Sequence, residues 1–138
     1  GAGVLGETLT LSGDLTLDDE SRIHLTLGGA SNPGQHTTLA RTGGGTWVFD
    51  SDQAFTFSLA SADPYGTYNS IITGLTGSEA GLATIGTWQL LNLPGGYTAT
   101  FSLDSGNVNL LVVPEPASAI LLLSGLGTLG LLRRRRAN

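Results

Sequence analysis

Apolar and polar residues alternate one by one along most of the chain, which is the pattern of β-strands with one buried face. The alternation runs through residues 9–17 and resumes in residues 23–27, after a cluster of acidic residues. A period of two places the leucines on one face of the strands, and Arg22 and His24 on the other. Glycine-rich stretches such as residues 43–45 interrupt the pattern and predict turns.

The middle of the chain continues in the same way, with aromatic residues at the alternating positions. Residues 46–50 and 54–59 are predicted to be a pair of neighbouring strands that share an apolar face. Residues 60–70 contain Asp-Pro-Tyr-Gly, a turn signal, and are expected to be a loop. The remaining predicted strands lie at residues 37–41, 71–72, 86–93, 97–103 and 108–113, the last two as a hairpin. About nine or ten short strands with no convincing helix predict an all-β body.

The end of the chain departs from this pattern. Pro114, Glu115 and Pro116 precede an uncharged apolar run from Ala117 to Leu132. Sixteen residues of helix span about 24 Å at 1.5 Å per residue, which is short for a bilayer core of roughly 30 Å. Arginines after the run extend it, because their stems lie in lipid while their guanidinium groups reach the headgroups. The pattern predicts a single transmembrane helix; a buried core helix is the alternative.

Charge predicts the orientation of this helix. Four arginines follow the run and one glutamate precedes it, so the carboxyl end is expected in the cytoplasm. Residues 1–113 would then form an extracytoplasmic domain, and residues 114–138 a tail in the inner membrane. The arginine cluster consists of Arg133, Arg134, Arg135 and Arg136.

These features, taken in order at the end of the chain, resemble the PEP-CTERM sorting tail of Gram-negative bacteria. They are Val-Pro-Glu-Pro-Ala-Ser at residues 113–118, the short apolar helix and the terminal arginines. The resemblance implies that a membrane-embedded processing enzyme, an exosortase, recognises the tail and cleaves near Pro-Glu-Pro, releasing the body to the cell surface or beyond. It also implies bacteria that make exopolysaccharide, which is therefore a candidate partner.

The body permits two all-β architectures. The rhythm of residues 9–17 and 24–29 is that of a β-solenoid coil and loosely resembles the C-terminal ends of proteins with autotransporter-associated β-strand repeats. Residues 1–113 would then be the last coils of a solenoid with a cap. A two-sheet sandwich fits the second half about as well. The sequence leaves this choice open.

Composition narrows the functional classes. The body has ten acidic residues, two arginines and no lysine, so its net charge is 2 − 10 = −8. Such a body lacks the basic footprint of a nucleic-acid-binding protein, and we expect no nucleic-acid partner. The chain has no cysteine, which excludes disulfides and thiolate sites. Because an acidic body must cross a membrane, we expect a secretion signal upstream of Gly1.

Candidate chemistry in the body is sparse. His24 and His36 lack the spacing of a zinc site, and we expect both to be solvated. Two acidic clusters, residues 18–20 and 50–52, could offer oxygens to calcium but fit turns better. Loop tyrosines could stack on sugars, although such residues usually cap packing; these are Tyr65 and Tyr68. We therefore predict no catalytic residue, no metal and no cofactor.

The sequence thus predicts an exported structural or adhesive β protein that is not an enzyme and is processed by an exosortase. The alternative is a carbohydrate-binding or hydrolytic domain on the same membrane tail. An uncleaved anchor is a third possibility.

Overall fold

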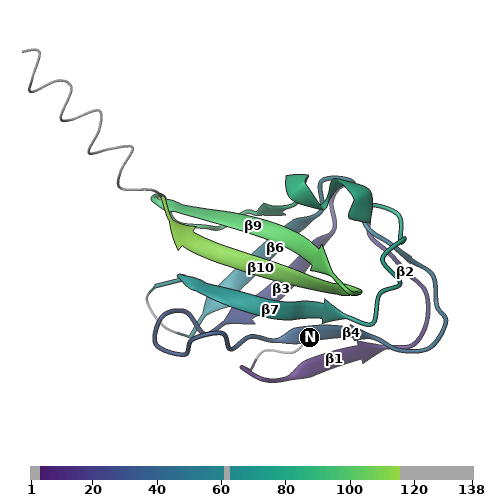
Figure 1. Ribbon diagram of the computed structural model, residues 1–138, viewed down its shortest axis with the longest axis horizontal. Coiled ribbons are helices and arrows are strands. Elements are labelled where there is room, and N and C mark those ends of the chain that lie inside the picture. The colour runs from purple at the N-terminus through teal and green to yellow at the C-terminus, as the bar shows by residue number, and fades with distance from the viewer. Residues whose placement is uncertain (1–3, 61–62, 116–138) are drawn as a thin grey trace, which may run out of the picture.

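The structure is a computed structural model that describes residues 4–60 and 63–115. Within these ranges the chain forms ten strands and one 3-10 helix, which confirms the all-β prediction for the body (Figure 1). The strands are β1 (Thr8–Leu11), β2 (Leu15–Thr16), β3 (Arg22–Leu27), β4 (Thr38–Arg41), β5 (Trp47–Val48), β6 (Ala54–Leu59), β7 (Gly66–Thr73), β8 (Gln89–Leu90), β9 (Tyr97–Asp104) and β10 (Asn107–Pro114), and the 3-10 helix η1 is Leu82–Thr87.

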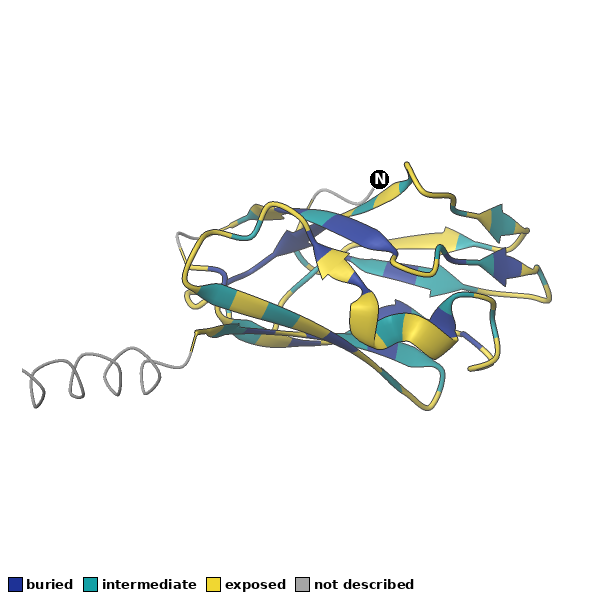
Figure 2. Ribbon diagram, turned by 90° about the horizontal axis from the view of Figure 1, so that it is seen from above, coloured by how far each residue is buried: buried dark blue, intermediate teal, exposed yellow. Residues whose placement is uncertain are grey.

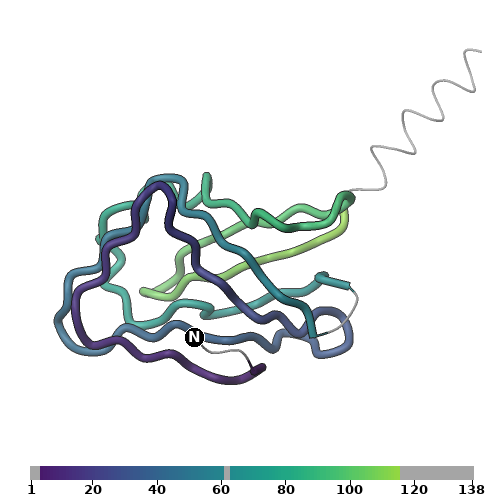
Figure 3. Tube along the Cα trace, turned by 180° about the vertical axis from the view of Figure 1, so that it is seen from behind, coloured from purple at the N-terminus to yellow at the C-terminus, as the bar shows by residue number. Residues whose placement is uncertain are grey.

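From β1 to β8 the body winds as stacked coils joined by parallel pairing. The strands β1, β2 and β3 of the first coil pair in parallel with β4, β5 and β6 of the second. Thr8 pairs with Thr38 and Arg22 with Ala54, so consecutive coils are about 30 residues apart. A third coil adds β7, a parallel bridge at Ala80 and β8. Figure 3 shows the first two coils as neighbouring purple and blue paths.

A hairpin closes the far end of this stack. The large sheet has the strand order β1-β4-β7-β10-β9, in which β7 pairs with β10 in antiparallel fashion. The hairpin runs in continuous register from Asn107 opposite Asp104 to Pro114 opposite Tyr97, as predicted from the alternation. The hairpin therefore caps this end of the stack. At the other end β1, β2 and β3 each pair with one strand only within the described residues.

The apolar faces of the coils meet in one core (Figure 2). Its centre is aromatic: Phe55 stacks on Phe101 with ring centroids 4.5 Å apart, and Trp88 lies 5.6 Å from Phe55. Phe101 belongs to the hairpin, so its ring joins the cap to the coils. Leu9 of the first coil, by contrast, is 42% exposed at the open end.

Glycines at the corners allow successive coils to stack closely. Gly74 has φ +81°, and a Cβ on it would collide with the carbonyl oxygen of Arg41 in the coil below. Gly45 approaches the carbonyl of Gly13 in the same way. These positions require glycine because the backbone of the neighbouring coil occupies the space of a side chain.

Three details of the predicted strands were wrong. Residues 46–50 and 54–59 do not pair with each other, because each joins the coil below it. The expected loop at 60–70 ends at Gly66, where β7 begins with Tyr68 inward and its neighbours outward. The predicted strand at 86–93 is reduced to Gln89–Leu90, since η1 occupies the residues before it.

Candidate functional site

The last strand of the body leads directly into the predicted sorting motif. The alternation of β10 buries Val108, Leu110 and Val112 completely, whereas Leu111 is 41% exposed. The strand ends at Pro114, which has no N–H to donate to a further ladder bond. The three residues that follow the buried Val112 are Val113, Pro114 and Glu115, and they are called the neck here.

Backbone pairing with the start of β9 holds the neck against the body. The N–H of Glu115 donates to the carbonyl of Gly96 at 2.7 Å, and Pro114 lies opposite Tyr97. Hydrogen-bonded and non-hydrogen-bonded pairs alternate in an antiparallel ladder. Pro114 therefore occupies a non-hydrogen-bonded pair. Its missing N–H consequently removes no hydrogen bond between β10 and β9.

Tyr97 connects the neck to a neighbouring turn. Its hydroxyl donates to Oδ1 of Asp63 at 2.8 Å. This carboxylate oxygen of Asp63 also accepts from the N–H of Tyr65 at 3.1 Å. The hydrogen bond to Asp63 raises the pKa of Tyr97, and desolvation and the Asp63 charge act in the same direction. Tyr97 thus remains a neutral hydrogen-bond donor beside the neck.

The predicted tail residues are only partly within the described chain. Pro114 and Glu115 have exposed side chains at the end of β10. The other predicted positions, namely Pro116, the span ends Ala117 and Leu132, and the cluster Arg133, Arg134, Arg135 and Arg136, lie outside the described residues. Among residues 4–60 and 63–115, no helix has the length and apolar character needed to cross a membrane.

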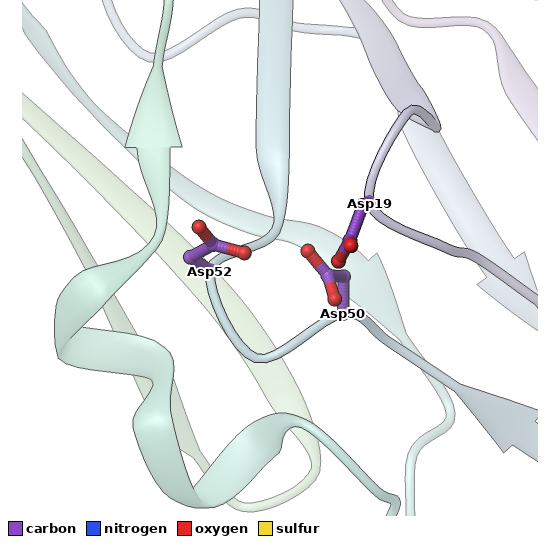
Figure 4. A group of neighbouring side chains, drawn as sticks. All are labelled: Asp19, Asp50 and Asp52. Atoms are coloured by element: carbon purple, nitrogen blue, oxygen red, sulfur yellow. The ribbon is translucent and has the colours of Figure 1, made fainter.

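The stacking of coils brings together acidic residues that the sequence analysis treated as separate turns. Carboxylate oxygens of Asp19, Asp50 and Asp52 lie within 4.8 Å of one another (Figure 4). A hydrogen bond with Asp50 and repulsion by its charge raise the pKa of Asp52. Such oxygens are the ligands that calcium takes. The signal that the sequence analysis missed is the coil period, which places residue 19 over residues 50 and 52.

The turn prediction was right for the neighbouring Asp18. Its Oδ1 accepts from the backbone of Glu20 at 3.3 Å and from the Ser21 hydroxyl at 2.9 Å. Asp18 therefore stabilises the turn and does not join the three-carboxylate group.

Both histidines make structural hydrogen bonds. The ring nitrogens of His24 lie 2.8 Å from the Thr56 hydroxyl and 2.9 Å from the Ser58 hydroxyl, on the outer face of β3 and β6. His36 is bound to backbone carbonyls of Thr37 and Asn69. In the part of the chain that the structure describes, neither histidine belongs to a group of metal-ligating side chains.

The two loop tyrosines have different environments. Tyr68 is fully buried; its hydroxyl donates to Pro64 at 2.7 Å and accepts from the N–H of Gly29 at 3.1 Å. It cannot stack on a ligand, and its burial agrees with the packing role that is usual for loop tyrosines. Tyr65 is 49% exposed beside a surface hollow of about 400 Å³, whose wall includes Pro33 and Thr67.

The comparison with protein families concerns the same end of the chain as the neck. A sequence model of the PEP-CTERM protein-sorting motif matches residues 112–136. The chain carries a PEP-CTERM sorting motif. The PEP-CTERM match begins at Val112, inside β10, so the sorting signal and the folded body share the residues of the neck.

The comparisons with curated proteins and with solved structures gave no match. The resemblance of the body to autotransporter-associated repeats therefore receives no support from them. The PEP-CTERM motif itself implies an exosortase as the processing enzyme, and it is consistent with a precursor held at the membrane before export.

Proposed function

We propose that this chain is an exported structural or adhesive β protein without catalytic activity, whose PEP-CTERM tail is recognised and cleaved by an exosortase. The observation that carries the proposal is the motif match at residues 112–136, which begins in the last strand of an all-β body. The body would be cell-surface or matrix material, and exopolysaccharide is its candidate partner.

The precursor would be a single-pass protein of the inner membrane. In this proposal the apolar run from Ala117 to Leu132 spans the bilayer, and the arginines at 133–136 lie in the cytoplasm. The body, with its net charge of 2 − 10 = −8 over residues 1–113, lies on the opposite side. After processing, the body would leave the membrane and the tail would stay behind.

The body itself would be the terminal part of a β-solenoid. Support comes from the parallel pairing of each strand with the strand about 30 residues later, which stacks coils in a solenoid. An immunoglobulin-type sandwich is built from antiparallel sheets instead. The β9–β10 hairpin closes one end of the stack, as a cap does, and the open end of the first coil would receive a further coil.

The absence of catalysis is supported by the roles of the polar residues in the described ranges. The histidines are engaged in holding strands and connections, and Asp18 stabilises a turn. A carbohydrate-binding function has weaker support, because only one of the two loop tyrosines is exposed. A single half-exposed ring at Tyr65 is a small platform for a sugar.

The sorting role is tested by replacing Pro114, Glu115 and Pro116 with alanines in the full-length precursor. In a host that has the exosortase, the altered chain should stay in the membrane fraction, while the unaltered body is released. Immunoblotting of membrane and medium fractions measures the difference. Mass spectrometry of the released body confirms that the tail has been removed.

A matched control replaces Pro94, which lies in an exposed turn outside the motif, with alanine. This chain should be released like the unaltered one. Equal release of the triple-alanine chain would remove the sorting claim, as would unchanged release in a host whose exosortase gene has been deleted.

A further inference from the structure

The pairing of β10 changes sharply at Val112. Up to this residue β10 is bonded on both sides: Val112 lies opposite Gly66 of β7 and opposite Ala99 of β9. Its side chain is fully buried in the core. A processing enzyme could reach the backbone here only if the strand left the sheet.

The neck is held more weakly. Val113 and Pro114 pair with β9 alone, opposite Thr98 and Tyr97. The last contact within the described residues is the hydrogen bond from Glu115 to the carbonyl of Gly96. Among the described residues, the neck backbone therefore has a strand partner on one side only, and that partner is β9.

Cleavage of a peptide bond in a folded protein requires local opening, and its rate follows the population of the opened form. Enzymes that act on extended segments also bind their backbone in the manner of an added strand. Opening β10 before Val113 would expose three fully buried side chains, Val108, Leu110 and Val112, and would separate the cap from the coils. Opening after Glu115 disturbs none of these contacts.

We infer that the exosortase cuts on the tail side of the Glu115 α-carbon, and that the start of β9, Gly96 and Tyr97, positions the cut. This inference rests on the proposed function, in which the tail is cleaved. The released body then keeps all of β10. Its last residue is Glu115 or a residue farther along the tail. The folded body thus protects the peptide bonds that precede Glu115, and the enzyme can cut only the bonds that follow it.

The chemical step breaks one peptide C–N bond. If water is the acceptor, its oxygen adds to the carbonyl carbon and a proton passes to the departing nitrogen, leaving a carboxyl group on the body and an amine on the tail. If an alcohol or amine of the matrix is the acceptor, it adds at the same carbon and loses one proton to the same nitrogen. The last body residue is the same in either case.

The first test is the C-terminal peptide of the body released from the full-length precursor, identified by tandem mass spectrometry. The expected peptide contains Glu115. A body that ends at Pro114 or earlier overturns the inference, while release itself would still stand. A chain with no cut removes the proposed function and this inference together.

The second test holds β10 in the sheet with an engineered disulfide to β9, and this variant is called the stapled chain. Thr100→Cys with Leu111→Cys joins two exposed residues of a hydrogen-bonded pair that lies just before the PEP-CTERM match, and the roughly 5.5 Å between the α-carbons of such a pair suits a disulfide. The unaltered chain has no cysteine, so no other disulfide competes. With the disulfide formed, release should proceed within about twofold of the unaltered chain, with the same last residue, because β10 does not open.

Thr100→Cys alone is the matched control, because it makes the same change in β9 without the bridge. Loss of release in the stapled chain that a reductant restores would show that β10 must open, and this would overturn the inference. Circular dichroism of the stapled chain and of the control first checks that both are folded. If the disulfide perturbs folding, the C-terminal peptide of the unaltered body decides the question.

Discussion

Glu79 illustrates how a single carboxylate stabilises a turn in the third coil. Its oxygens accept from the backbone and the hydroxyl of Thr76, at 2.6 and 2.9 Å, and from the N–H of Gly77 at 3.0 Å. Partial burial acts to raise the pKa of Glu79, but these hydrogen bonds outweigh it and lower the pKa. The ionised form is therefore favoured in the folded state.

The shift predicts a pH-dependent contribution to stability. Because the folded-state pKa of Glu79 is lowered, its contribution is present above the ordinary pKa and is lost as the pH falls through the lowered value. Glu79→Gln should lower the free energy of unfolding by about 1 kcal/mol at neutral pH and leave it unchanged in strong acid. Urea unfolding of the released body measures both values.

The control for this prediction is Glu20→Gln, which changes an exposed glutamate in the turn before β3. It should leave the free energy of unfolding nearly unchanged at both pH values. A loss for Glu79→Gln that persists in acid would show that the charge is not its cause.

At this scale, sequence could predict residues whose role depends on near neighbours. The turn role of Asp18 and the outward position of His24 follow from adjacent residues, and both agree with the structure. Residues brought together by stacking could not be predicted, because the offset between coils is a property of the fold. The Asp19, Asp50 and Asp52 group and the buried Tyr68 are of this kind.

Among the elements, the β9–β10 hairpin binds the coils through both its ladder and its core residues. Phe101 is 2% exposed and stacks on Phe55 of the second coil. Phe101→Ala would leave a cavity between cap and coils, and it should lower the free energy of unfolding by about 3–5 kcal/mol. Denaturant unfolding of the released body measures the loss.

Thr100→Ala is the matched control on the same strand, since the Thr100 side chain is exposed. It should change the free energy of unfolding by less than about 0.5 kcal/mol. Similar losses for both variants would mean that the ring of Phe101 does not join the cap to the coils.

The hairpin was predictable because alternation and a short turn define it locally. Strand β7 was harder to predict, since its first half reads as a polar turn. A side chain from β10 completes it: Asn109 Oδ1 accepts from the N–H of Ser70 at 2.7 Å, where Ser70 has φ +59° and the register shifts. This contact joins positions 39 residues apart, and no local pattern reveals it.

In the whole molecule, stability should differ between the two ends of the stack. Each coil is stabilised by its neighbours, and the first coil has only one within the described chain. Strand β1 buries none of its four residues, whereas the other edge strand, β9, buries Phe101. Amide hydrogens of β1 should therefore exchange faster than those of β9, and those of β10 should be slowest.

Hydrogen exchange followed by mass spectrometry of the released body tests this order. The comparison of β1 with β9 is internally matched, because both are edge strands of the same sheet. Equal protection of the two would show that the open end is as stable as the closed one.

The position of β10 also bears on the order in which the molecule can be made. The strand nearest the carboxyl end lies between β7 and β9, so the sheet is complete only when almost the entire body is available to fold (Figure 1). For a chain that crosses a membrane amino end first, the coils can form one after another during transit, and the hairpin docks last. Under the proposed function, a tail that holds the precursor at the membrane after β10 would give this final docking time to occur before the protein diffuses away.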